Sequence, residues 1–157
     1  MKPTYFPILK AKDAEFKALQ NAEPEITQSM VPLFEIPRFQ PELKRYQDNP
    51  LAKATFLSEL SESIKRIRSG MYTMFDTYHW QNPGDKVETG EHHLTFMYNA
   101  LKNDGVNPIP VVGYDRWDDD EYRLALRSIS QTHDGIFSLR LERYALEDVK
   151  FYIFQRI

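Results

Sequence analysis

Residues 71–113 read MYTMFDTYHWQNPGDKVETGEHHLTFMYNALKNDGVNPIPVVG, and this stretch decides the fold class. The apolar run at its start predicts a buried strand, and the run PIPVVG at its end predicts a second one. Between them Leu94, Met97 and Leu101 recur at helical spacing, and Gly105 marks the end of the helix. A crossover helix of this kind joins parallel strands. The stretch therefore predicts one β-α-β unit of a parallel sheet.

The same alternation of strand and helix continues on both sides of this unit. Further strands are predicted at residues 5–10, 30–36 and 136–141, and further helices after Asp13, from Asn49-Pro50 to Gly70, and around the inward-facing Tyr122, Ala125, Leu126 and Ile129. We therefore expect a single α/β domain over residues 1–157, in which about five consecutive βα units form a parallel sheet as a partial or incomplete TIM-like barrel. An open doubly wound sheet is the alternative.

The last segment of the chain leaves the architecture open. Val149, Ile153 and Ile157 recur at the spacing of an amphipathic helix, but no capping residue follows them. Five units are also too few for the usual eight-stranded barrel. Three interpretations follow: a natural five-stranded doubly wound domain, the N-terminal part of a longer barrel, or a part-barrel that pairs with a second copy.

The composition narrows the class of protein. The chain contains no cysteine, which excludes disulfides and thiolate metal sites. Its formal net charge of -3 provides no general attraction to nucleic acid or to an anionic membrane. No apolar run approaches the length of a membrane span, and no secretory signal is recognisable. We therefore expect a cytoplasmic protein without a membrane partner, and the charge does not indicate a nucleic-acid partner.

Every predicted strand ends in ionisable residues, at the edge where function collects in parallel α/β folds. Glu35 and Asp76 are the candidate catalytic residues, because paired carboxylates suit acid-base chemistry. The candidate ligand-binding residues are Lys10, Lys12, Tyr114, Asp115, Arg140 and Arg143, and the basic ones among them suit a phosphate or carboxylate group. Period-two alternation brings Lys10, Glu35, Asp76 and Arg140 together if the polar faces of the strands turn inward. The alternative is that these charges only mark where the chain re-enters water.

No motif identifies a cofactor or a metal. The glycines form neither a phosphate-binding loop nor a nucleophile elbow. The acidic run at 118–121 is interpreted as the first turn of a helix, where negative charge complements the helix dipole. His79 and the pair His92-His93 are interpreted as loop histidines, and Trp80 and Trp117 as residues that pack loops onto the sheet or line a pocket. No metal site is therefore predicted, and the cofactor stays open.

Two apolar stretches near the start, YFPILKAK at residues 5–12 and VPLFEIP at residues 31–37, resemble the phage and prophage beta protein family. Phe75-Asp76 and IFSLRL at residues 136–141 resemble the strand ends of that family. The resemblance implies the N-terminal part of a longer barrel, carried by phages and mobile elements and involved in conflict between phage and host. The positions that match the family pattern are Lys10, Lys12, Glu35, Asp76 and Arg140.

These observations support two functional hypotheses. The first is a partner-binding or self-associating module in phage-host conflict, with a protein partner or a second copy of the chain. The alternative is a barrel enzyme that acts on a phosphorylated or nucleotide-like ligand at the carboxyl ends of the strands. An anionic small molecule is the ligand class that fits the second hypothesis, and the sequence leaves open whether the protein is an enzyme.

Overall fold

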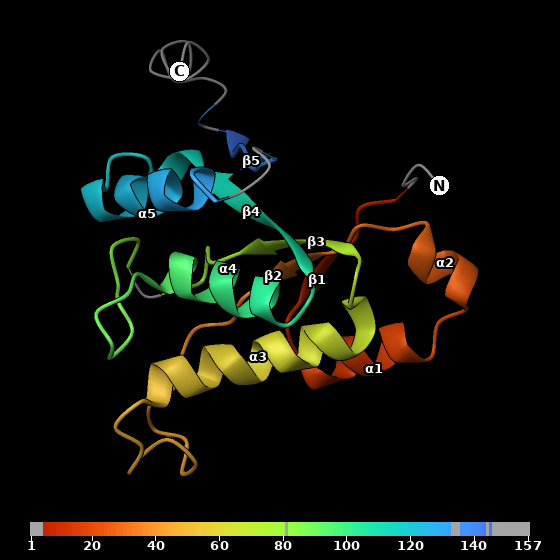
Figure 1. Ribbon diagram of the computed structural model, residues 1–157, viewed down its shortest axis with the longest axis horizontal. Helices are drawn as coiled ribbons and strands as arrows, with labels where there is room; N and C mark the ends of the chain where they lie inside the picture. The colour runs from red at the N-terminus through yellow and green to blue at the C-terminus, as the bar shows by residue number, and fades with distance from the viewer. Residues whose placement is uncertain (1–4, 81, 133–135, 144, 146–157) are drawn as a thin grey trace.

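The computed structural model of the protein describes residues 5–80, 82–132, 136–143 and 145 (Figure 1). Five strands alternate with helices along the chain. In chain order the elements are β1 (Ile8–Lys10), α1 (Asp13–Gln20), α2 (Pro24–Gln28), β2 (Leu33–Glu35), α3 (Ala52–Arg68), β3 (Tyr72–Asp76), α4 (His93–Asn103), β4 (Asn107–Gly113), the 3-10 turn η1 (Tyr114–Arg116), α5 (Asp120–Ser130) and β5 (Ser138–Arg140).

The five strands form one sheet in the order β1-β2-β3-β4-β5, and every neighbouring pair is parallel. This confirms the predicted α/β fold with its parallel sheet. The strands follow one another across the sheet in chain order, whereas in a doubly wound sheet this order reverses. Because right-handed crossovers in a sequential sheet all fall on one side, the helices collect on a single face. Over the residues that the structure describes, the sheet is open and is not a closed barrel.

The helices form one curved layer in which α1 contacts α3, α3 contacts α4, and α4 contacts α5 (Figure 1). The main core lies between this layer and the sheet. Strand residues such as Phe34 and Phe75 meet helix residues such as Leu57, Met97 and Ile129, all of which are buried. On the other face of the sheet Val31, Met74 and Val111 form a smaller apolar cluster with Leu33 and Ile109.

Several helix boundaries follow from local chemistry. Gly70 and Gly105 adopt positive φ angles directly after α3 and α4, which confirms the predicted helix ends. The inward residues predicted for α5 are the buried ones, and Asp119 caps that helix by accepting a hydrogen bond from the backbone N–H of Tyr122. The acidic run at 118–121 therefore lies at the start of α5, as expected.

Two predicted helix starts were wrong. Asp13 is the first helical residue of α1, and the N-cap is Lys12, which makes no side-chain capping hydrogen bond. Asn49 and Pro50 precede α3, whose N-cap is Leu51. The carboxylate of Glu88, from the loop before α4, instead accepts hydrogen bonds from the N–H groups of Lys53 and Ala54. A cap supplied from a distant loop leaves no local signal in the sequence.

The structure differs from the sequence-based expectations in two further places. The short helix α2 was not predicted, because its five residues are too few to show a helical period. Leu139 alternates with the polar Ser138 and Arg140 and was therefore expected on the face that meets helices, but it is 47% exposed, because in the described part of the chain no helix covers the outer face of β5. The helix expected near the end, at 146–157, lies outside the described residues.

None of the helices in the described part of the chain combines the length and the hydropathy that a membrane span requires.

Candidate functional site

The face of the sheet that the helices leave uncovered changes character along the strands. Towards the amino ends it carries the small apolar cluster around Met74 and Val111. Towards the carboxyl ends the same face carries Glu35 and Asp76, which are paired in register at the ends of β2 and β3. Arg140 belongs to this face of β5 because successive strand residues alternate between faces. Lys10 of β1 pairs in register with Glu35, so four strands contribute to the polar end of the face.

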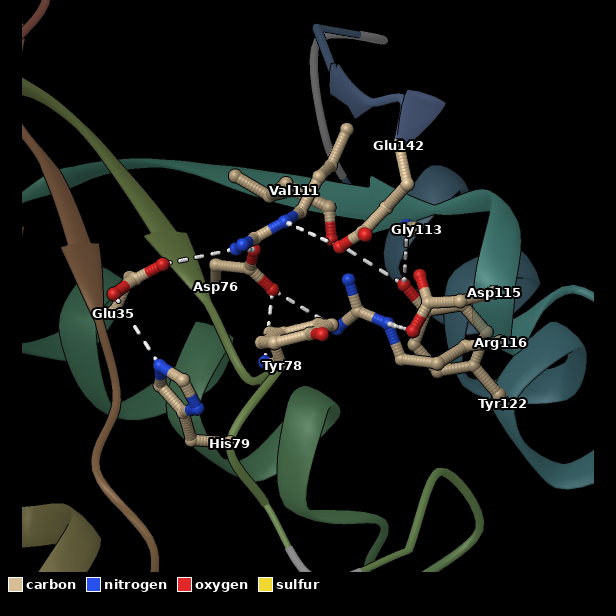
Figure 2. Close-up of polar contacts among 11 residues, drawn as sticks. Glu35, Asp76, Tyr78, His79, Val111, Gly113, Asp115, Arg116, Tyr122 and Glu142 are labelled. Atoms are coloured by element: carbon tan, nitrogen blue, oxygen red, sulfur yellow. Dashed lines mark hydrogen bonds and ion pairs between the residues drawn. The ribbon is translucent and has the colours of Figure 1, made fainter. Parts of the chain in front are cut away.

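Asp76 lies at the centre of this polar end and is fully buried. One of its oxygens accepts a hydrogen bond from Arg140 Nη1 at 2.8 Å, and the other lies 2.9 Å from Arg116 Nη1 (Figure 2). The second oxygen also accepts a hydrogen bond from the backbone N–H of Tyr78 at 2.9 Å. Two arginines from β5 and η1 thus converge on one carboxylate, which offsets the cost of burying its charge.

The two arginines are held in place by their surroundings. The guanidinium of Arg140 lies 4.0 Å from the centre of the Tyr78 ring, and that of Arg116 lies 5.9 Å from it. Arg116 is buried and passes directly over Gly113, where the Cβ of any other residue would overlap its guanidinium. Gly113 is therefore required by the close approach of a buried arginine.

Glu35 connects this buried network to the partly exposed His79. Its carboxylate accepts a hydrogen bond from Arg140 Nη1 at 3.0 Å and lies 3.3 Å from Nε2 of His79, which is partly exposed. Partial burial raises the pKa of Glu35, but the hydrogen bonds with Arg140 and His79 outweigh burial, so the pKa lies below its ordinary value. Burial lowers the pKa of Arg140, whereas its hydrogen bonds to Asp76 and Glu35 raise it, and the net shift is upward. Both groups are therefore charged at neutral pH.

An open cavity of about 810 Å³ lies beside this network, at the carboxyl ends of β1 and β2. Its first wall is formed by strand ends and the segments that follow them, and the polar side chains of this wall are Lys10, Lys12, Asp13, Glu35, Arg38 and His79. Its second wall is formed by α3 and by the loop between β2 and α3. Glu35 and His79 thus belong to both the buried network and the cavity.

The cations of the first wall differ from the other basic residues of the site. Arg116 and Arg140 are bound to carboxylates, and Arg45 on the second wall lies 3.5 Å from Glu59. Lys10, Lys12 and Arg38, by contrast, make no ion pair and no side-chain hydrogen bond with any residue that the structure describes. The cavity therefore carries three cations without an ion pair in the described part of the chain, and one carboxylate, Asp13, that also has none.

An aromatic ladder holds the loops around the cavity. The ring of Phe39 lies 5.4 Å from Tyr46 and 5.7 Å from Phe56, and Phe56 lies 6.1 Å from Trp80. Trp80 stacks on His93 at 5.1 Å. Trp80 is therefore a packing residue, which is one of the two roles predicted for it. The ladder connects the loop after β2 to the start of α4 and so gives the cavity a rigid base.

The predicted site residues fall into three groups in the structure. Glu35, Asp76 and Arg140 meet in the buried network, as the strand-end pattern predicted. Lys10 and Lys12 line the cavity and do not contact that network directly. Tyr114 and Asp115 belong to η1, where Asp115 lies 3.5 Å from Nε of Arg116, and Arg143 is exposed beyond β5.

Three residues of the site were missed by the sequence-based prediction: Arg38, His79 and Arg116. Each lies three positions beyond the last residue of its strand, whereas the prediction took mainly the residues nearest the strand ends. A window one residue wider would have included Arg38 and Arg116. His79 was considered and interpreted as a loop histidine, because its carboxylate partner comes from a different strand.

The chemistry of the site favours an anionic ligand over a metal ion. Within the described ranges no group of three or more histidine or carboxylate residues is placed to hold a metal. Among the described residues, three of the free groups on the first wall are ammonium and guanidinium ions, which bind phosphate and carboxylate oxygens, against one free carboxylate, that of Asp13. No residue pattern points to a particular cofactor.

Comparison with known proteins supports the family resemblance. No curated protein and no solved structure matches the chain significantly. The model of the family described as Beta protein matches residues 5–152, which is nearly the whole chain. The chain therefore belongs to the Beta protein family, which suggests a phage-associated protein.

Proposed function

We propose that this phage-associated chain is a ligand-binding module that holds an anionic group, a phosphate or a carboxylate, in the cavity at the carboxyl ends of β1 and β2. The observation that carries the proposal is the set of three cations on the first wall, Lys10, Lys12 and Arg38, which have no ionic partner among the described residues. Unpaired cations on one side of a cavity attract an anion more strongly than paired ones, because no internal contact is lost on binding.

Two features of the surroundings support this proposal. Helix α1 begins at the cavity, and its N-cap Lys12 supplies no side-chain acceptor, so the backbone N–H groups of its first turn lie at the same space, where Asp13 and Glu15 partly offset the positive end of the helix dipole. Two of the three carboxylates that line the cavity are occupied elsewhere, since Glu35 bonds Arg140 and Glu59 accepts a hydrogen bond from Tyr46, whereas Asp13 has no ion pair within the described residues. The charge of Glu35 and Glu59 therefore repels a bound anion less than free carboxylates would.

The candidate catalytic residues have different positions in this proposal. Both oxygens of Asp76 are engaged in the buried network, so we assign it the task of holding the arginines in place. Glu35 reaches the cavity together with His79, so it is the carboxylate of the two that can act on a bound ligand. An enzymatic role for the protein would use Glu35 and His79 as the catalytic pair.

The proposal is tested by titrating inorganic phosphate and pyrophosphate into the protein by isothermal calorimetry. The double variant Lys10→Ala with Lys12→Ala is expected to bind pyrophosphate at least about tenfold more weakly, since a tenfold change corresponds to about 1.4 kcal/mol and each lost charge-assisted contact is worth about that much or more. The matched control is Lys17→Ala with Lys44→Ala, which removes the same charge from exposed positions outside the cavity. Equal losses in the two variants would show that only the overall charge matters, and no binding to the unmodified protein would refute the proposal.

A second candidate function is self-association as a partner-binding module in phage-host conflict, and the uncovered face of the sheet favours it. Ile8 on β1 and Tyr72 on β3 are 68% and 47% exposed on that face. The edge strands β1 and β5 have no further strand beside them in the described part of the chain. A second copy related by a twofold axis parallel to the strands would place its β5 parallel to β1, which continues the order of every existing pair.

A further inference from the structure

The second wall of the cavity has a chemistry that the anion proposal does not use. Residues at positions i, i+3, i+4 and i+7 of α3 share one face of that helix, and this face lines the cavity with Phe56, Glu59, Leu60 and Ser63. The loop between β2 and α3 adds Leu43 and Gln40. This wall therefore combines apolar side chains with carboxylate, amide and hydroxyl groups.

These groups suit an uncharged, hydroxyl-bearing body better than a second anionic group. Arg45, the cation of this wall, is engaged by Glu59 and also lies over the ring of Tyr46. The side chain of Glu59 is 47% exposed, and its carboxylate keeps lone pairs beyond those used by Tyr46 and Arg45, so it can accept hydrogen bonds from ligand hydroxyl groups. The exposed Leu43 offers an apolar surface for a ring.

The size of the cavity also favours a ligand in which the anionic group is attached to a larger body. A volume of about 810 Å³ lies within the range of roughly 300–1,000 Å³ that is typical of sites for whole small molecules. A lone phosphate ion would contact the first wall and leave the α3 wall to water. An anion with an attached body would contact both walls and would release that water.

We infer that the ligand is a nucleoside monophosphate, whose phosphate group contacts Lys10, Lys12 and Arg38 and whose sugar and base lie against Glu59 and Leu43. This inference rests on the proposed function, because it takes the anionic end of the ligand from it. What it adds is the chemical class of the rest of the ligand, a hydroxyl-bearing sugar joined to a planar ring.

The test compares four probes by isothermal calorimetry: inorganic phosphate, ribose 5-phosphate, AMP and adenosine. AMP is expected to bind at least about tenfold more tightly than inorganic phosphate, with ribose 5-phosphate between them and adenosine weakest. Equal affinities for AMP and phosphate, or for AMP and ribose 5-phosphate, would overturn the inference and leave the proposed function standing. Adenosine binding as tightly as AMP would overturn the proposed function, and so would the failure of all four probes.

A variant assigns the effect to the second wall. Leu43→Ala is expected to lower the ratio of AMP affinity to phosphate affinity about fivefold, because it removes apolar surface under the ring. The matched control is Leu124→Ala on the exposed surface of α5, which leaves the ratio unchanged. Thermal unfolding of both variants verifies that they fold. An unchanged ratio in folded Leu43→Ala would contradict the proposed position of the base.

Discussion

At the scale of single residues, the carboxylate of Asp76 holds the end of β3 in a fixed position relative to β5 and η1. It contacts Arg140 from β5 and Arg116 from η1, and it accepts the backbone N–H of Tyr78. A buried carboxylate with two cationic partners is costly to disturb, because the loss of its charge removes the buried partner that both arginines share. Asp76 thus acts on the cavity indirectly, through Arg140 and its contact with Glu35.

We predict that Asp76→Asn lowers the free energy of unfolding by about 3–5 kcal/mol. The asparagine keeps the size of the side chain, but its NH₂ group faces a guanidinium that it cannot pair with. Urea denaturation measures the change, and Asp48→Asn in an exposed loop serves as the control. A loss below about 1 kcal/mol, in the range of surface ion pairs, would show that the arginines do not depend on this charge.

At the scale of elements, the start of α4 is built from two buried histidines. His92 caps the helix, with its Nδ1 accepting the N–H of Leu94, and His93 Nδ1 lies 2.7 Å from the carbonyl oxygen of Asp85. Burial and the neighbouring His92 both lower the pKa of His93, and the hydrogen bond to Asp85 raises it by less. The net result is a pKa of about 3. The helix start is therefore stable only while His93 is neutral.

This arrangement predicts a pH dependence of stability. Below about pH 6.5 the unfolded chain binds a proton at His93 that the folded chain excludes, so the free energy of unfolding decreases as the pH falls from 6.5 towards 3. The lowered pKa of His92 acts in the same direction, and that of Glu35 adds a loss only below about 4.3. Urea denaturation between those two limits should show a shallower slope in His93→Phe than in the unmodified protein. An identical slope would mean that His93 is protonated in the folded state.

At the scale of the whole molecule, the two ends of the sheet use arginine differently. At the amino ends Arg68 is buried and donates hydrogen bonds to the carbonyl oxygens of Thr27, Met30 and Tyr72, which joins α3 to α2, to the segment before β2, and to β3. At the carboxyl ends the arginines meet carboxylates and border a cavity. In parallel α/β folds the first arrangement serves stability and the second serves ligand binding.

The uncovered face of the sheet leads to a prediction at the same scale. If a second copy covers it, sedimentation velocity should show a dimer that dissociates on dilution. Ile8→Glu should shift this equilibrium towards the monomer, because it places a charge on the exposed apolar face. Leu124→Glu makes the same change on the outer surface of α5 and should leave the equilibrium unchanged. A monomer at every concentration, or a dimer that tolerates Ile8→Glu, would exclude this mode of association.

Much of the fold could be predicted, because strands and helices leave periodic patterns in neighbouring residues. The buried face of α5 and the glycines after α3 and α4 were predicted from such patterns. The starts of α1 and α3 were not, because Lys12 caps without a side-chain bond and Glu88 caps from a distant loop. The short α2 was missed because it contains too few residues to show a period.

The sequence by itself determined the succession of five strands with crossover helices and the gathering of charge at the strand ends, since both depend on residues that are close in the chain. Only the tertiary structure decided which of those charges meet. Arg140 bonds Glu35 across 105 positions, whereas Lys10 at a neighbouring strand end stays unpaired beside the cavity. The physical reason is that an ion pair depends on strand register and on the path of the loops, and both are set by packing between distant segments.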